Sequence, residues 1–248
     1  MDPGTAIAAG LEMLRAGADI VDVGGESTRP GSDPVDVQVE QDRTIPVIRG
    51  ILAGNPTAVI SIDTRRSRVA GAALEAGAQI INDVSGFRDD WGVVDLAVES
   101  GAAVIVMHML GTPATMQKDI RYEVFPQDIY DFLEERICVL EAAGINPEKI
   151  VVDPGIGFGK SFDQNLILIN RLEIFKPLGK PILVGASRKA FLGAILDEPV
   201  ASARDIGAVA VSTAAILRGA SMIRAHDVPS AVQAVKVADA VMRERVDS

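Results

Sequence analysis

The chain has 248 residues, and its 24 lysines and arginines stand against 34 aspartates and glutamates, giving a net charge of −10. Apolar residues make up 48% and charged residues 23%, which excludes a disordered chain and leaves ample material for a core. The negative charge argues against non-specific binding of nucleic acid or of an anionic membrane, although it permits a local cationic pocket.

Helical and strand patterns alternate along the chain without a break in composition. Helices are expected at 2–16, 37–53, 66–76, 91–100, 126–143, 163–176, 188–196, 202–218 and 228–245. Short apolar strands are expected at 20–23, 58–62, 79–81, 104–107, 150–152, 182–184 and 222–223. Four Gly-Ala pairs each stand between a helix and a strand, as expected where a glycine ends the helix: Gly17-Ala18, Gly77-Ala78, Gly101-Ala102 and Gly219-Ala220.

Short, wholly apolar strands between helices indicate a parallel sheet that is covered on its faces. A (β/α)8 barrel and an open doubly wound sheet are the two candidate architectures. No G-x-G-x-x-G motif follows a strand, which removes the usual dinucleotide-binding form of the open sheet. The count of seven strands and about eight helices fits the barrel better. Because no linker-like segment divides the chain, we predict a single domain over residues 1–248.

Cysteine and histidine are scarce. Cys138 is the only cysteine, which excludes an intramolecular disulfide and a Cys-ligated zinc site. His108 and His226 are the only histidines, so we expect no His-rich metal site. The first residues show no basic flank followed by an apolar run, and no uncharged apolar stretch reaches the roughly 18 residues of a membrane span. These features favour a cytoplasmic protein.

Polar residues follow every predicted strand, and in a βα barrel the carboxyl ends of the strands carry the chemistry. One such residue alone would more often be a helix cap or a solvated charge. Together they predict a small-molecule site at one rim. The groups are GGESTRPG (24–31), Asp63, Asn82-Asp83, His108-Met109, DPGIGFGK (153–160), GASRK (185–189) and RAHD (224–227).

These residues divide into two chemical halves. The first half combines two carboxylates, an amide and a cation: Asp63, Asn82, Asp153 and Lys189. It suits a flat heterocycle with an amidine-like edge, because a carboxylate accepts two parallel N–H bonds. The second half, Arg29, Arg224 and His226, suits a phosphate or diphosphate. No Walker P-loop motif is present.

Seven segments in chain order carry a resemblance to a known family: VDVGGESTRPG (21–31), SIDTRRSRVA (61–70), INDVSG (81–86), VMHMLGTPATMQ (106–117), VVDPGIGFGK (151–160), VGASRKAFLG (184–193) and IRAHDV (223–228). Together they resemble the dihydropteroate synthases of the pterin-binding enzyme family. The resemblance implies an α/β fold, a (β/α)8 TIM barrel. It also implies a transferase that joins 6-hydroxymethyl-7,8-dihydropterin diphosphate to p-aminobenzoate, giving 7,8-dihydropteroate and diphosphate in folate biosynthesis.

The resemblance also assigns expected roles to residues of this chain. The pterin site would comprise Asp63, Asn82, Met109, Asp153, Gly185, Lys189 and Arg224. The diphosphate and p-aminobenzoate site, where sulfonamides compete, would comprise Thr28, Arg29, Phe158, Ser187, Arg224 and His226. Lys189, Asp63 and Arg224 are expected to be catalytic. The residue types fit departure of diphosphate followed by attack of the amine, because the acidic half would stabilise a cationic pterin and the cationic half the leaving group.

Cofactor and partners are likewise implied by the resemblance. We expect Mg²⁺ at the diphosphate, without a metal-ligating residue that can be named in this chain. The partners would be small-molecule substrates, and neither nucleic acid nor a membrane. A homodimer is expected, since the family tends to dimerise and the C-terminal helices are apolar enough to allow it.

The chain departs from the family pattern before its first helix. The family opens with a strand and a loop reading roughly N-x-T-P-D-S-F, and the asparagine associated with magnesium lies in that loop. We therefore expect seven strands, with the first barrel strand missing and two strand edges able to pair. Three hypotheses stay open: an active synthase, a pterin-binding but catalytically impaired paralogue, and a methyltransferase that moves a methyl group from methyltetrahydrofolate to a corrinoid protein. The STRPG, GFGK and SRK segments favour the synthase over the methyltransferase.

Overall fold

The computed structural model describes residues 2–28 and 31–245. Its strands are β1 (Ile20–Gly24), β2 (Val59–Asp63), β3 (Ile80–Asp83), β4 (Ala103–Met107), β5 (Ile150–Asp153), β6 (Leu183–Val184) and β7 (Met222–Ile223). Its α-helices are α1 (Pro3–Arg15), α2 (Val37–Gly54), α3 (Ser67–Glu75), α4 (Gly92–Ser100), α5 (Gln127–Ala142), α6 (Phe162–Asn170), α7 (Ala190–Leu196), α8 (Asp205–Leu217) and α9 (Val228–Arg243). Each predicted strand is present, with its ends within two residues of the expected positions.

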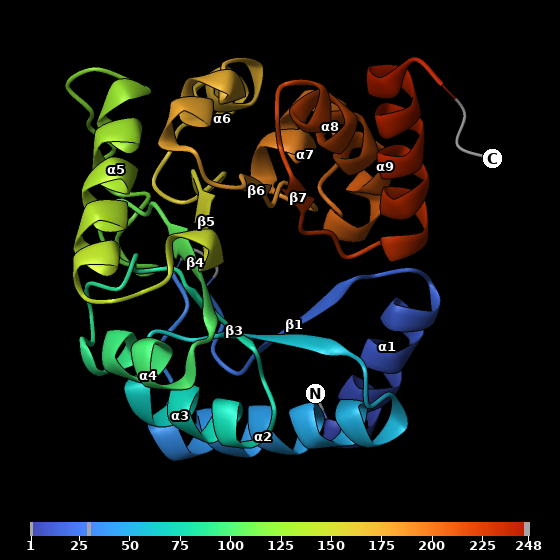
Figure 1. The fold of residues 1–248 in the computed structure, drawn as a ribbon. Coiled ribbons are helices and arrows are strands. Elements are labelled where there is room, and N and C mark those ends of the chain that lie inside the picture. The colour runs from blue at the N-terminus through green and yellow to red at the C-terminus, as the bar shows by residue number, and fades with distance from the viewer. Residues whose placement is uncertain (1, 29–30, 246–248) are drawn as a thin grey trace.

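All strand pairs are parallel, as the alternation of helices and strands predicts. β1 to β5 form one sheet in chain order, and β6 pairs with β7. A single parallel bridge between Val152 and Ile182 links the two groups of strands. In β1, β2 and β3, Gly24 lies level with Asp63, and Asp63 with Asn82, so the carboxyl ends of these strands meet at one rim. Figure 1 shows the helices arranged around the outside of the strands.

The ring of strands is not closed within the described part of the chain. There, β1 pairs with β2 alone and β7 with β6 alone, so the outer edges of β1 and β7 carry no neighbouring strand. Figure 1 shows β1 and β7 on the two sides of this interruption. The α/β class is confirmed, whereas the closure of an eight-strand barrel stays a prediction.

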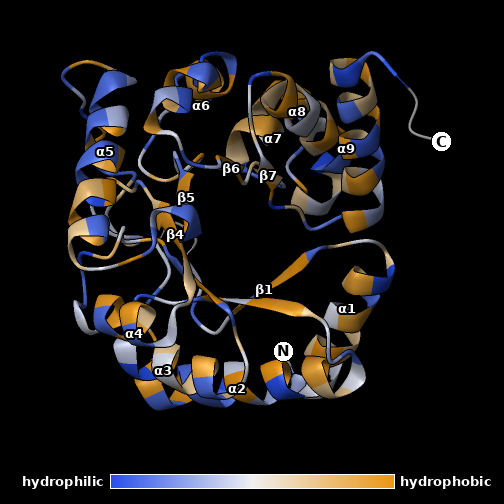
Figure 2. Cartoon of the chain, viewed as in Figure 1, coloured by the Kyte–Doolittle hydropathy of each residue, from blue (hydrophilic) through white to orange (hydrophobic). Residues whose placement is uncertain are grey.

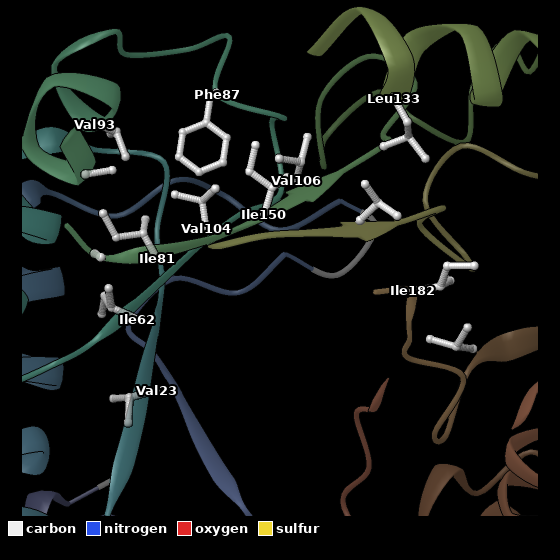
Figure 3. Close-up of a cluster of buried hydrophobic side chains, with 14 of the residues drawn as sticks. Val23, Ile62, Ile81, Phe87, Val93, Val104, Val106, Leu133, Ile150 and Ile182 are labelled. Carbon is white, nitrogen blue, oxygen red and sulfur yellow. The ribbon is translucent and has the colours of Figure 1, made fainter. Parts of the chain in front are cut away.

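Side chains alternate between the two faces of the strands, because successive residues of a strand point in opposite directions. The outward residues pack against the helices, as Figure 3 shows for Ile62, Ile81 and Val104. The inward residues form a smaller apolar layer with a contribution from every strand: Ile20, Val59, Ile80, Ala103, Ile105, Val151, Leu183 and Met222. This layer is the floor beneath the polar rim.

Helix termini follow the local sequence. Asp2 accepts the backbone N–H of Thr5 and Pro3 opens α1, while Ser161 and Gln164 form a reciprocal capping box at α6. The helix predicted at 163–176 is instead α6 followed by 3-10 turns over Leu172–Leu178. The α-helix breaks at Arg171, whose φ of −114° and ψ of 27° lie outside the α-helical region. The helix predicted at 202–218 likewise opens with 3-10 turns at Ala201–Arg204 before α8.

Exposed apolar side chains gather on the last helices: Ile195 and Leu196 on α7, Ile206 and Leu217 on α8, and Val237, Val241 and Met242 on α9. Figure 2 shows apolar colouring on the outer surfaces of these helices. Within the described residues, no single helix is long and apolar enough to cross a bilayer. The segments Ala190–Leu196 and Ala201–Leu217 would match a span together in length and composition, but they bend by 76° from each other.

Candidate active site

The polar rim is built from the inward positions at the carboxyl ends of the strands. Asp22, Asn82 and Asp153 each follow an inward apolar residue of the same strand by two positions. Gly185 and Arg224 stand in the same relation to Leu183 and Met222, just after β6 and β7. Because every second side chain of a strand points to the same face, these residues point inward like the apolar floor and lie in the space above it.

Arg224 joins the two ends of the strand array. Its Nη2 atom lies 2.8 Å from Asp22 Oδ2 and 3.0 Å from Asp63 Oδ2. Asn82 Nδ2 donates to Asp22 Oδ2 over 3.3 Å. The guanidinium thus bridges the interruption between β7 and β1 by side-chain contacts where the backbones do not pair.

Burial and mutual repulsion shape the acid–base behaviour of the carboxylates. Burial, with the nearby charge of Asp22, raises the pKa of the Asp63 carboxyl to about 7 even though Arg224 opposes the shift. The charge of Asp22 in turn holds the pKa of Arg224 above its ordinary value. Burial also raises the pKa of Asp153, against the 2.7 Å hydrogen bond that its Oδ1 accepts from Gly155 N–H.

Asp22 belongs to this cluster, although sequence reasoning did not single it out. Its Oδ1 atom is buried and has no hydrogen-bond partner among the described residues. The donors around Asp22 contact only Oδ2, which leaves Oδ1 as a buried acceptor beside the rim. The signal that could have found it is an aspartate within the strand Ile20–Gly24, at the inward parity set by Ile20.

Lys189 and Phe158 form a second group at the rim. Lys189 Nζ lies 4.1 Å from the centroid of the Phe158 ring, a cation–π contact. Phe158 and Met109 are buried in one apolar cluster with Val84, Met107 and Met116. Gly185 lies beside Arg224, where a Cβ atom would be 3.6 Å from Arg224 Cβ.

Ser187 and His226 form a third group. Ser187 Oγ lies 3.0 Å from His226 Nδ1 and accepts the backbone N–H of His226 over 3.2 Å. Thr28 is partly buried in the loop after β1. Arg29, predicted to bind an anion, lies outside the described residues.

Three charged side chains that the sequence analysis did not select hold the loop after β1. Glu26 Oε2 accepts the backbone N–H of Val35 over 3.0 Å. Its two carboxylate oxygens also pair with Arg65 over 3.1 Å and with Arg66 over 2.7 Å, both residues following β2. The loop that carries Thr28 is therefore fastened to the neighbouring strand end, and the adjacent arginines after Asp63 were the available signal.

The described residues do not assemble a protein metal site. No three His, Cys, Asp or Glu side chains gather closely enough to hold an ion within 2–28 and 31–245. The two carboxylates that lie closest to each other at the rim, Asp22 and Asp63, both pair with Arg224. The donor set at this rim therefore suits a cationic or N–H-rich ligand edge beside an anion.

Comparison with known proteins identifies the family. A family description, "Pterin binding enzyme", matches residues 1–226. The chain belongs to the pterin-binding enzyme family. The dihydropteroate synthase of a Synechocystis species is 42% identical over 239 residues, which cover 96% of this chain and 82% of that protein.

Two solved structures share the fold over nearly the whole chain. The dihydropteroate synthase of Yersinia pestis, in a complex with a sulfonamide drug, matches with a TM-score of 0.93 and 37% identity, covering 98% of this chain and 87% of that one. The dihydropteroate synthase of Xanthomonas albilineans, with 4-aminobenzoic acid, matches with a TM-score of 0.91 and 39% identity, covering 97% and 85%. The predicted resemblance is confirmed.

Proposed function

We propose that this chain catalyses the dihydropteroate synthase reaction, the condensation of 6-hydroxymethyl-7,8-dihydropterin diphosphate with p-aminobenzoate to 7,8-dihydropteroate and diphosphate. The observation that carries the proposal is the arrangement of charge at one rim. Two carboxylates, the buried Asp63 and the partly buried Asp22, lie against Arg224 there. The relatives reported above, themselves dihydropteroate synthases, support the same reaction.

The reaction proceeds in two steps. The C–O bond between the pterin methylene and the diphosphate breaks, and its electron pair leaves with the diphosphate. The amine nitrogen of p-aminobenzoate then forms a C–N bond to the methylene, and the proton lost from that nitrogen passes to solvent. No side chain forms a covalent intermediate, so the residues at the rim act by binding and by electrostatic stabilisation.

The carboxylate side of the rim binds the pterin in this proposal. Asp63 and Asp153 accept the N–H groups of its amidine-like edge, and Asn82 supplies a donor and an acceptor beside them. Arg224 balances the charge of the buried carboxylates and contacts the ring, while Met109 and Gly185 line the pocket. Lys189 reaches a polar atom of the pterin ring from the side of Phe158.

The remaining rim residues hold the second substrate and the leaving group. His226 and Arg224 bind the diphosphate, with Arg29 assigned to the same role from its sequence position. Phe158, Thr28 and Ser187 flank p-aminobenzoate, where a sulfonamide would compete. The contact between Lys189 Nζ and the Phe158 ring supports this arrangement, because it brings the two substrate sides together.

The proposal includes Mg²⁺ only as an ion that is bound to the diphosphate of the substrate. Mg²⁺ commonly binds substrate phosphates while keeping several of its waters, with few protein ligands. We therefore propose that Mg²⁺ arrives with the diphosphate, and that residues 1–248 work as one domain in the cytoplasm. Turnover assayed with excess EDTA should fall to background and return with added Mg²⁺; unchanged turnover in EDTA would remove the metal from the proposal.

A homodimer is the proposed assembly. The apolar side chains on α7, α8 and α9 supply a candidate surface, with Ile206 86% exposed and Val237 63% exposed. A patch of this kind on a water-facing surface is typical of a protein contact. A second copy of the chain is the occupant we propose, since no strongly charged partner would complement so apolar a surface.

The direct test is a condensation assay with both substrates and Mg²⁺. We expect dihydropteroate formation at a rate that saturates in each substrate and is inhibited by a sulfonamide in competition with p-aminobenzoate. Tight binding of a pterin by calorimetry without product formation would instead indicate the impaired, binding-only paralogue. Methyl transfer from methyltetrahydrofolate to a corrinoid, with no condensation, would indicate the methyltransferase.

A further inference from the structure

A glycine-rich turn, residues 154–160, follows β5 and carries Phe158 to the rim. Gly155, Gly157 and Gly159 have φ values of 72°, 82° and 67°, a region that favours glycine. At Gly155 and Gly159 a Cβ atom would collide with His108 O and with Leu110 respectively. The turn is thus closely fitted to the residues after β4, and its shape decides where the Phe158 ring lies.

Lys160 lies beneath this turn and is buried, with 2% of its surface exposed. Its Nζ atom lies 2.9 Å from His108 Nδ1, 2.9 Å from Phe158 O and 3.3 Å from His108 O. None of these three acceptors is a carboxylate; burial lowers the pKa of Lys160 to about 7, although the nearby charge of Asp153 opposes the shift. Burying an amine in such surroundings costs free energy that an apolar side chain would not.

The imidazole of His108 is suited to its part in this arrangement. Burial, together with the charges of Lys160 and Arg88, lowers the pKa of His108 to about 2, so the ring is neutral near pH 7. A neutral imidazole can accept a hydrogen bond at Nδ1 when its proton is on Nε2. The amine of Lys160 therefore ties the end of β4 to the turn after β5 through three neutral acceptors.

Other side chains fasten the same turn from its remaining sides. Asn165 Oδ1 accepts the backbone N–H of Gly157 over 2.6 Å. Gln117 Nε2 donates to Gly157 O over 3.1 Å, and Tyr122 donates its hydroxyl to Gly159 O over 2.7 Å. Of these contacts, the bond from Lys160 Nζ is the one that reaches the carbonyl of Phe158.

We propose that Lys160 is a positioning residue for the second substrate. It touches neither substrate; it holds the Phe158 backbone so that the ring stays over Lys189 and forms a fixed wall of the p-aminobenzoate side. This inference rests on the proposed function. It also explains why a buried amine occupies this position, although an apolar side chain would fill the space at a lower cost in free energy.

Steady-state kinetics of Lys160→Met test the proposal. Losing the fixed position of Phe158 should raise the KM for p-aminobenzoate about 10-fold and change the KM for the pterin diphosphate by less than about twofold. A residue needed only for stability would lower the amount of active enzyme and move neither KM. The matched control is Lys180→Met, because Lys180 donates to Glu141 Oε1 and Pro147 O away from the rim, and both KM values should stay unchanged.

Hydrogen exchange provides a second readout that does not need turnover. In Lys160→Met, the backbone amides of residues 155–160 should exchange at least about 10-fold faster than in Lys180→Met. Equal KM values and equal exchange in the two variants would overturn the proposal. If wild-type protein makes no dihydropteroate, the proposed function fails and exchange still decides whether Lys160 fixes the turn. If neither Lys160→Met nor Lys160→Gln folds, Lys160 is a residue of folding stability and the proposal is wrong.

Discussion

Two carboxylates, the buried Asp63 and the partly buried Asp22, depend on the single guanidinium of Arg224. Asp22 and Asp63 both pair with its Nη2 atom, and the pKa of Asp63 is already raised to about 7 with that cation in place. Without the cation, the remaining pair of acids would repel each other and take up protons more readily. The charge of the carboxylate side of the rim therefore depends on one residue of the cationic side.

Replacing Arg224 with methionine removes the guanidinium while keeping much of the apolar stem. We expect kcat/KM for the pterin diphosphate to fall about 100-fold or more, because both the leaving group and the carboxylates lose their cation. The control is Arg218→Met, which breaks only exposed contacts, with Glu173 and with Asn170. Turnover by Arg224→Met within about threefold of wild type would contradict the assigned role.

Asp83 gives a stability prediction outside the site, because its side chain points toward the helices and its Oδ2 has no described partner. Burial raises its pKa from 3.8 to about 6, so the folded state holds this proton more tightly than the unfolded state. Wild type should lose stability as pH rises from about 4 through 6, whereas Asp83→Asn should not. Between pH 4 and pH 6, the free energy of unfolding of the variant should therefore rise by about 2 kcal/mol relative to that of wild type in urea titrations.

Asp90 supplies a control of opposite sign. Hydrogen bonds from the hydroxyl and the backbone N–H of Ser67, with the backbone N–H of Gly92, hold the pKa of its carboxyl below the ordinary value. Its contribution to stability is present above pH 4 and is lost as pH falls through the lowered pKa. Asp90→Asn should therefore be less stable than wild type at pH 7 and approach it in acid; the same pH trend in both variants would contradict the account.

Individual residues differ in how far the sequence could predict them. Asp63, Asn82 and Arg224 were expected at the rim, and the structure brings them together with Asp22. Asp22 was missed because it lies inside a strand, and polar residues were sought after strand ends. Lys160 was seen only as part of a motif, since its burial depends on His108, which is 52 residues away along the chain.

In the glycine turn after β5, the backbone conformation and the close neighbours restrict which residues can be accommodated. Gly155 combines a φ of 72° with no room for a Cβ atom, which would overlap the carbonyl of His108. Gly155→Ala should therefore lower the free energy of unfolding by about 2–4 kcal/mol in denaturant titrations and raise the KM for p-aminobenzoate.

Gly179 provides the matched control for that substitution. It has a similar φ of 67°, but a Cβ atom there would meet nothing within 4 Å. Gly179→Ala should cost only the backbone strain, about 1 kcal/mol, and leave both KM values unchanged. An equal loss of stability in the two variants would show that the overlap with His108 is relieved at no cost.

At the scale of elements, apolar periodicity located every strand, because each strand is short, apolar and bounded by a helix and a turn. The irregular segments were harder to predict from the sequence. The 3-10 turns at Leu172–Leu178 replace the second half of an expected helix, and the sequence has no glycine or proline at the break after Asn170 that would signal it. The fastening of the loop after β1 by Glu26, Arg65 and Arg66 depends on two strands meeting at one rim, which local patterns do not specify.

At the scale of the whole molecule, the exposed apolar surface of α7–α9 predicts association of two copies. Val237→Glu places a charge on the α9 part of that surface, where Val237 is 63% exposed and Val241 62% exposed. We expect the sedimentation mass to fall from a dimer to a monomer at micromolar concentration, because a charge would be buried without a partner. Val98→Glu, on α4, should leave the mass unchanged, and a monomeric wild type would contradict the assembly.

The sequence is sufficient to predict a parallel sheet with its strands in chain order, but not how the ring of strands closes. Parallel strands in chain order follow from the alternation of helices and strands. What local patterns could not supply is how β7 and β1 face each other. There the described backbone makes no pairing, and the contact passes through the side chains of Arg224 and Asp22.

The pairing of Arg224 with Asp63 spans 161 residues of the chain. Contacts of that separation are the slowest to form, because the whole intervening chain must first be ordered between them. During synthesis, β1 to β5 can pair successively as they emerge, whereas the carboxylates of β1 and β2 wait unpaired for an arginine made near the end. The pocket is therefore completed last, and a ribosome-bound chain that has not yet released residue 224 has a sheet without its binding site.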